Sequence, residues 1–319
     1  MTERFFSLGR FAMREALRYC GVGPEDRVML PSFICRDVLA SIAELKAKVA
    51  YYEVDDELKP VSLDPATTAK VVVAVNYFGF PQDLRPFNEY CAITGATLIE
   101  DNAHGFLSRD EDDKPLATRA KFGVTSFRKT LNVDDGAILT TSLHESEIAP
   151  QIQYRDAPTS TRTLLVGRLA SLQNKTRLPL VATAQLVSRL MRRIRTGSSL
   201  PRSEPNVESV IPGSAAPTRQ SLLAVKNLDS TTEIARRREM YAKIEPQVRK
   251  AGIKTIFDLL PTYTCPCGLP VYAETHQVKR LKQIARRNRV TLMSWPDLPA
   301  EVEPIAPQHY SKVWLLNFK

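Results

Sequence analysis

The feature that most constrains the fold is an apolar run of mainly β-branched residues at 71–76, with the sequence VVVAVN. Uninterrupted runs of this kind form parallel strands that are covered on both faces. A helical pattern at 84–94 and a second strand pattern at 96–100 follow along the chain. The repeated order of strand, loop and helix predicts an α/β fold with a mainly parallel sheet, flanked by helices and joined by right-handed crossovers.

Further elements of the same kind are expected earlier in the chain. Apolar residues recur with helical period at 5–20, around the turn Ser7-Leu8-Gly9-Arg10. A short apolar strand at 27–31 ends at a proline. A helix at 32–45 and a strand at 49–54 come next.

The pattern changes after Thr141. Residues 164–195 are largely helical and basic, and residues 196–217 are rich in Ser, Pro and Gly. The remaining expected elements are a long helix at 219–252, a strand at 263–273, a helix at 278–287 and an edge strand at 290–293. We therefore expect a large α/β domain at 1–200, a linker at 201–218 and a smaller C-terminal α+β domain at 219–319.

The net charge of +9 is concentrated in one segment, residues 151–200. Nine Arg and Lys side chains oppose Asp156 there, so the segment carries +8. It lacks interleaved aromatic residues and any recognised nucleic-acid module, so we expect no nucleic-acid partner. A solvated helical face is the main interpretation, and contact with an anionic substrate, lipid headgroups or a partner protein stays open.

Cysteine usage and the N-terminal sequence indicate a cytoplasmic enzyme. The five cysteines are odd in number and irregularly spaced, which favours reduced thiols over a disulfide framework. Cys265 and Cys267 form a CPC motif, but without a second pair we expect no zinc or other metal site. Charges scattered through residues 1–30 fit neither a cleavable signal nor a membrane-spanning helix.

Polar residues follow two expected strands at their carboxyl ends. Asp101 and His104 follow the strand at 96–100, and Ser126, Arg128 and Lys129 follow the apolar segment GVTSF. Ligands of open α/β sheets bind at this edge. An acid and a lysine on neighbouring strands are what pyridoxal 5'-phosphate (PLP) requires, because the lysine forms a Schiff base and the acid keeps the pyridine nitrogen protonated.

A candidate phosphate site lies near the N-terminus. Gly9 lets the backbone approach a ligand, and the helix that follows offers free N–H groups and the positive end of its dipole. Arg10 adds a positive charge. An ordinary N-cap turn is the alternative interpretation of this segment.

In these segments the chain resembles the DegT/StrS-type sugar aminotransferases, which are fold-type I PLP enzymes. The resemblance covers most of its length and is strongest in SLGRFAMREAL, EDRVMLPSFIC, VNYFGFPQDL, LIEDNAHGF and SFRKTLNVDDGAILTT. It implies that Lys129 carries the cofactor and moves protons, that Asp101 pairs with the pyridinium nitrogen and that His104 lies against the ring hydroxyl. The alternatives are a structural acid at the strand end for Asp101, a core histidine for His104 and a surface basic pair for Arg128 and Lys129.

The resemblance also assigns the remaining cofactor contacts. Ser126 and the Gly9–Arg10 turn would hold the phosphate, and Phe33 or Cys35 would lie against the ring. The chain departs from the family in three respects. Many members space the lysine farther from the serine than Lys129 lies from Ser126, the aromatic residue that stacks on the ring is not obvious in PSFIC, and the cross-subunit asparagine loop has no clear match. Relatives also usually extend further at both ends, so we expect either a compact branch or a truncated chain.

The resemblance implies a homodimer and an aminotransferase with a ping-pong Schiff-base mechanism. The resemblance implies an amino acid as the amino donor, with glutamate expected, and a keto-sugar as the acceptor, expected to be nucleotide-linked. Two alternatives stay open. One is a PLP enzyme with a different reaction, such as a sugar dehydratase or an enzyme with a non-sugar substrate, and the other is a catalytically degenerate relative that binds a partner.

Overall fold

A seven-stranded mixed sheet forms the larger part of the computed structural model, which describes residues 1–156, 168 and 206–319. The strand order is β1-β7-β6-β5-β4-β2-β3. Neighbours from β3 to β6 pair in parallel, whereas β7 is antiparallel to both β6 and β1. The strands are β1 (Thr2–Phe6), β2 (Arg27–Pro31), β3 (Lys48–Tyr52), β4 (Val71–Val75), β5 (Thr97–Asn102), β6 (Phe122–Thr125) and β7 (Ala137–Thr141). The predicted mainly parallel sheet is therefore confirmed.

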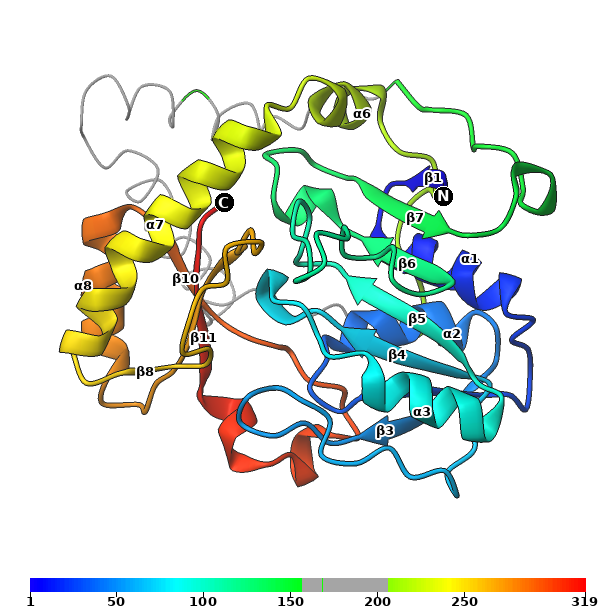
Figure 1. Cartoon of the computed structure of the whole chain (residues 1–319), viewed down its shortest axis with the longest axis horizontal. Helices are drawn as coiled ribbons and strands as arrows, with labels where there is room; N and C mark the ends of the chain where they lie inside the picture. Colours follow the sequence, from blue (N-terminus) through cyan, green and yellow to red (C-terminus); the bar gives the residue numbers. More distant parts are fainter. Residues whose placement is uncertain (157–167, 169–205) are drawn as a thin grey trace.

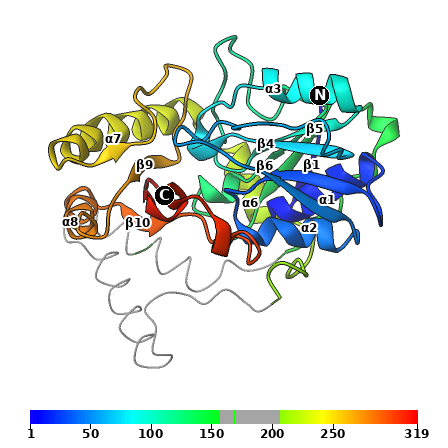
Figure 2. The same cartoon turned by 90° about the horizontal axis from the view of Figure 1, so that it is seen from below.

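Helices cover both faces of this sheet. Figure 2 shows α3 (Arg85–Thr94) on one face and α1 (Gly9–Tyr19) with α2 (Leu39–Ala43) on the other. The whole of β4 is buried between these layers, as the run of valines predicts. Short 3₁₀ helices connect other segments: η1 (Arg36–Val38), η2 (Tyr77–Gly79), η3 (Phe127–Lys129), η4 (Glu145–Glu147), η5 (Glu303–Ile305) and η6 (Gln308–Lys312).

Two of the predicted helices differ from the structure near the N-terminus. The helix predicted from residue 5 begins only at Gly9, because the residues before it form the edge strand β1, whose Phe6 is paired with Ala137. The helix predicted at 32–45 is reduced to η1 and α2. Its first residues are instead drawn into a loop, where the Ser32 N–H donates to the Tyr52 carbonyl and the Ser32 hydroxyl bonds the Tyr310 hydroxyl.

A second, antiparallel sheet lies beside the first, with strand order β10-β11-β9-β8 (Figure 1). Helices α7 (Ser230–Lys250) and α8 (Val278–Asn288) pack against it. This is the expected C-terminal α+β unit, although one hydrophobic core runs through both sheets, so the predicted domain boundaries stay a prediction. The strands are β8 (Lys254–Thr255), β9 (Gly268–Tyr272), β10 (Thr291–Ser294) and β11 (Val313–Asn317).

The single long helix predicted at 219–252 is wrong. It is two helices, α6 (Arg219–Lys226) and α7, because Asp229 accepts a hydrogen bond from the Thr232 N–H at 3.1 Å and starts a new helix. The strand predicted at 263–273 begins only at Gly268. Before it, the Cys267 N–H donates to the Phe78 carbonyl, which ties this loop to the larger sheet.

The basic segment is largely outside the described residues. Its predicted helices at 164–195, apart from residue 168, and the first five residues of the predicted linker at 201–218 fall there. In the part of the chain that the structure describes, no helix is both long and apolar enough to cross a bilayer.

Candidate active site

Parallel strands β5 and β6 bring the predicted catalytic residues to one edge of the sheet. Asp101 lies opposite Val124 in the pairing register, so the segments that follow the two strands leave the sheet side by side. There the Nζ atom of Lys129 lies 3.2 Å from Nε2 of His104. The side chains that the sequence places after two separate strands therefore meet, as predicted for a ligand site at this edge.

Lys129 is positioned by the tight turn η3 and its apolar anchor. The Lys129 N–H donates to the Ser126 carbonyl at 3.0 Å. Phe127 is fully buried and packs with Leu131 and Ile138. Leu131, two positions after Lys129, is thus a core residue, and Lys129 is the residue of this turn that reaches His104.

Asp101 is a buried carboxyl with one short backbone partner. It is 8% exposed, and its Oδ1 accepts a hydrogen bond from the Ala103 N–H at 2.8 Å. Burial raises the pKa of Asp101 above its usual value, while the nearby charge of Lys129 opposes the rise. The ionised carboxylate is therefore poorly solvated, and a cationic group bound beside it would stabilise it.

His104 is fixed between aromatic rings. Its ring is stacked on Phe78 with the centroids 5.6 Å apart, and the Trp295 ring meets it nearly edge-on at 5.2 Å. The backbone N–H of Phe78 donates to Nδ1 at 3.5 Å. Burial, with the charge of Lys129 in addition, lowers the pKa of His104 well below its usual value. His104 is thus neutral near pH 7.

The two candidates for the ring contact are placed differently. Phe33 is fully buried among aromatic side chains, with its centroid 5.0 Å from that of Trp295 and 4.7 Å from that of Tyr310. Cys35 lies within the electrostatic influence of Lys129 and Asp101, and burial raises its thiol pKa to about 12. Cys35 is therefore a neutral thiol close to the predicted catalytic pair.

Trp295 is a site residue that the sequence reasoning did not identify. It follows β10 in the smaller sheet and contacts His104, Phe33 and Phe78. A tryptophan directly before a proline after a predicted edge strand was the only local signal. Its contact with His104 depends on how the two sheets pack.

The residues of the predicted phosphate site meet where α1 begins beside β6. A Cβ atom placed on Gly9 would be 3.8 Å from both Ser126 Cβ and Val124 Cγ1, so the start of the helix lies against the end of the strand. The Leu8 N-cap supplies no side-chain hydrogen bond to α1. The first N–H groups of the helix are thus available to a ligand.

Three buried polar atoms around this helix start have no hydrogen-bond partner among the described residues. They are Ser126 Oγ, the Arg10 nitrogen Nη1 and Arg128 Nε. Buried polar groups are normally satisfied, and unpaired donors cost about 1–3 kcal/mol each. Two guanidinium groups and a hydroxyl are donors that suit a phosphate, so the residues present fit a phosphate-bearing cofactor.

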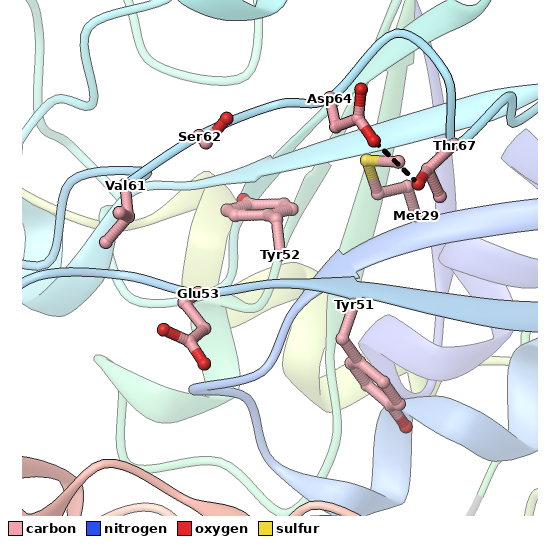
Figure 3. A pocket seen from close by; sticks show the side chains of 8 residues that line it. All are labelled: Met29, Tyr51, Tyr52, Glu53, Val61, Ser62, Asp64 and Thr67. Atoms are coloured by element: carbon pink, nitrogen blue, oxygen red, sulfur yellow. Dashed lines mark hydrogen bonds between the residues drawn. The ribbon is translucent and has the colours of Figure 1, made fainter.

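The structure contains a separate hollow at the edge strand β3. It encloses about 230 Å³ and is shown in Figure 3. Its lining contains none of the predicted site residues, and its Asp64 carboxylate bonds Thr67 of the same loop.

Among residues 1–156, 168 and 206–319, no three His, Cys, Asp or Glu side chains are grouped so that they could hold a metal ion. All five cysteines are free thiols.

This architecture is the fold of solved aminotransferase structures, PLP and PMP forms among them. The family model of the DegT/DnrJ/EryC1/StrS aminotransferases matches residues 6–192, and the chain belongs to that family. The sequence is 31% identical over 142 residues to the UDP-2-acetamido-2-deoxy-3-oxo-D-glucuronate aminotransferase of Pseudomonas aeruginosa. That match covers 42% of this chain and 38% of the relative, well under two thirds of the relative's length.

Solved structures share the fold at low sequence identity. A DegT DnrJ EryC1 StrS aminotransferase from Brucella abortus has a TM-score of 0.64 at 14% identity, covering 99% of this chain and 80% of that one. The aminotransferase TlmJ from Streptoalloteichus hindustanus has a TM-score of 0.64 at 19% identity with the same coverage. A Streptococcus pneumoniae protein in its PLP form has a TM-score of 0.62 at 12% identity, covering 99% of this chain and 81% of that one.

Proposed function

We propose that this chain is a PLP-dependent aminotransferase that transfers an amino group from an amino acid, glutamate, to a nucleotide-linked keto-sugar by a ping-pong mechanism. The observation that carries the proposal is the 3.2 Å contact of Lys129 Nζ with His104 Nε2, beside the buried carboxyl of Asp101. Family membership supports the reaction class. The Pseudomonas relative, named for a UDP-linked keto-sugar acid, supports the acceptor class.

PLP, when bound, supplies an aldehyde carbon and a pyridinium ring that withdraws electrons from the reacting carbon. Lys129 is the residue that would hold it covalently. Its Nζ atom, when free, is the base that takes a proton from the substrate carbon and returns it. His104 bonds that nitrogen and orients it, and its own ring is neutral near pH 7.

The other residues hold and polarise the cofactor. Asp101 would keep the proton on the pyridine nitrogen, because a buried carboxylate gains most from a cation placed beside it. Ser126, the N–H groups at Gly9 and the Arg10 guanidinium would hold the phosphate. Cys35 and Phe33 are the proposed contacts of the ring face.

The visible absorption spectrum tests the half-reaction. We expect added PLP to give a band that bleaches with glutamate and returns with a keto acid. Borohydride reduction followed by peptide mass spectrometry should place the cofactor on Lys129. Lys129→Ala should lose both signals, and Lys114→Ala, an exposed lysine whose side chain is 64% accessible, should keep them. A covalent label retained by Lys129→Ala would refute the assignment.

Two further outcomes separate the alternatives. An absorption band that does not change with any amino donor, together with turnover of the sugar when no amino donor is present, would indicate dehydration in place of transamination. Failure of the unaltered chain to bind PLP would favour a degenerate relative. The proposed homodimer is tested by light scattering, for which a mass near 35.8 kDa would indicate a monomer.

A further inference from the structure

Arg128 is a charged side chain for which the proposed reaction has no use. It stands between the phosphate-site serine and Lys129, and its N–H donates to the Gly136 carbonyl at 3.2 Å. Its carbonyl accepts from Lys319 Nζ at 2.6 Å. The backbone of Arg128 is therefore held from two sides, while its Nε atom is buried without a partner among the described residues.

Positive charge exceeds negative charge around this guanidinium. Arg10 Nε lies 3.7 Å from Asp37 Oδ2, and Asp37 is also the principal acid acting on Arg128. Asp135 acts on it less, and its oxygens already accept hydrogen bonds from Arg155 and Thr218. Two guanidinium groups thus share essentially one available carboxylate.

The unsatisfied donors lie on three neighbouring segments. Ser126 is 2% exposed and lies against the start of α1, Arg10 is the second residue of that helix, and Arg128 is two residues beyond Ser126. A phosphate monoester dianion carries two charges and three acceptor oxygens. Two guanidinium groups and about half a charge from the helix dipole, offset by Asp37, would nearly balance it.

We propose that Arg128 and Arg10 bind one phosphate monoester together, with Ser126 and the start of α1, so that two guanidinium groups hold a single phosphate. The phosphate is that of the cofactor, and the inference in this respect rests on the proposed function. On this proposal Arg128 binds a ligand and is not part of a surface basic pair. Burial lowers the pKa of the Arg128 guanidinium, which fits a group whose counter-charge arrives with the ligand.

The test compares PLP with pyridoxal, which has the aldehyde and ring but lacks the phosphate. In Arg128→Met the affinity for PLP should fall roughly 10- to 100-fold, as expected for a charge-assisted hydrogen bond, and the affinity for pyridoxal should not change. Arg10→Met should show the same pattern from the helix side. Arg109→Met, which removes a 46% exposed arginine paired with Asp113, is the matched control and should change neither affinity.

Two results of the comparison between PLP and pyridoxal would overturn the proposal. One is an Arg128→Met protein that binds PLP within twofold of the unaltered chain. The other is an equal loss of PLP and pyridoxal affinity in both arginine variants, which would indicate a purely structural role.

Inorganic phosphate separates this inference from the proposed function. Calorimetric titration of cofactor-free Lys129→Ala with phosphate should still show binding, and adding Arg128→Met to it should abolish that binding. Phosphate binding in Lys129→Ala does not depend on the covalent bond, so it would support the anion site even if Lys129 were not the cofactor lysine. No phosphate binding by either protein would overturn the site while leaving the assignment of Lys129 intact.

Discussion

Arg237 is a fully buried arginine that joins the smaller sheet to the turn carrying Lys129. From α7 it donates to the Thr130 carbonyl at 2.8 Å and to the Pro266 and Cys267 carbonyls at 3.3 Å each. Its charge is balanced by Glu233 on the same helix at 2.6 Å. We expect Arg237→Met to be severely destabilising.

The size of the effect follows from what the substitution leaves behind. The Thr130 and Pro266 carbonyls lose their buried donor, whereas the Cys267 carbonyl keeps the Phe318 N–H, and each unsatisfied group costs about 1–3 kcal/mol. Glu233 keeps Arg236 as a partner, so the carboxylate itself is not left alone. The expected loss is therefore about 3–5 kcal/mol, in the range found when one partner of a buried ion pair is removed. That is a large part of an ordinary stability of about 5–15 kcal/mol.

Urea denaturation of the two variants Arg237→Met and Arg236→Met measures this loss against a control. Arg236 lies on the same helix and bonds the same Glu233, but its side chain is 42% exposed. Exposed ion pairs contribute about 0–1 kcal/mol, and Arg236 also donates to the Phe318 carbonyl, so Arg236→Met should lose clearly less stability than Arg237→Met. Equal losses of unfolding free energy in the two variants would refute the reasoning, because burial would then not distinguish the two arginines.

Three further substitutions give expected outcomes of other kinds. Burial raises the pKa of Asp101, so its ionised form destabilises the fold at neutral pH. Cofactor-free Asp101→Asn should therefore unfold at a higher urea concentration than the unaltered chain at pH 7. A lower stability of this variant would contradict the reasoning. Burial lowers the pKa of His104, so below about pH 6.5 only the unfolded chain takes up a proton at this residue. The free energy of unfolding should then fall by up to about 1.4 kcal/mol per pH unit. His104→Gln should reduce this slope between denaturation at pH 6.5 and at pH 5.5, and an unchanged slope would disprove the reasoning. Gly136 has a φ of 136°, and an added Cβ would lie 1.9 Å from the Phe127 ring, so Gly136→Ala should lower the free energy of unfolding by at least about 2 kcal/mol. Gly23→Ala, with open space around the added Cβ, is the control and should not show this loss in thermal or urea unfolding. Similar losses in the two variants would contradict the steric explanation.

The parallel strands could be predicted because each carries its own signal. β4 is a run of valines and alanine that is buried along its whole length, and the predicted strand before Asp101 is β5. Edge strands give weaker signals because half of their surroundings is solvent or a distant partner. β1 pairs with β7, more than a hundred residues away, so the sequence near residue 5 could be interpreted as the start of a helix.

The meeting of the proposed catalytic residues at one edge of the sheet was predictable for a topological reason. Asp101 lies at the end of β5, His104 just after it and Lys129 just after β6, and the carboxyl ends of neighbouring parallel strands meet at one edge. Trp295, just after β10, and Arg237, on α7, approach from the C-terminal unit, so their contacts depend on how the two units pack. Nothing in the local sequence around either residue encodes that packing.

The electrostatics of the site support one ligand of mixed charge over separate anion and cation sites. Burial raises the pKa of Asp101 and lowers that of Arg128, so groups of opposite sign are each held away from solvent in their charged forms. They cannot serve as partners for each other, because Asp37 is the main acid acting on Arg128 and Lys129 is the main cation acting on Asp101. A molecule with a protonated ring nitrogen at one end and a phosphate at the other would supply both missing counter-charges in a single binding event. A simple anion would pair with Arg128 but would bring no cation to the buried carboxylate of Asp101. The proposed cofactor carries both charges and therefore accounts for both buried groups.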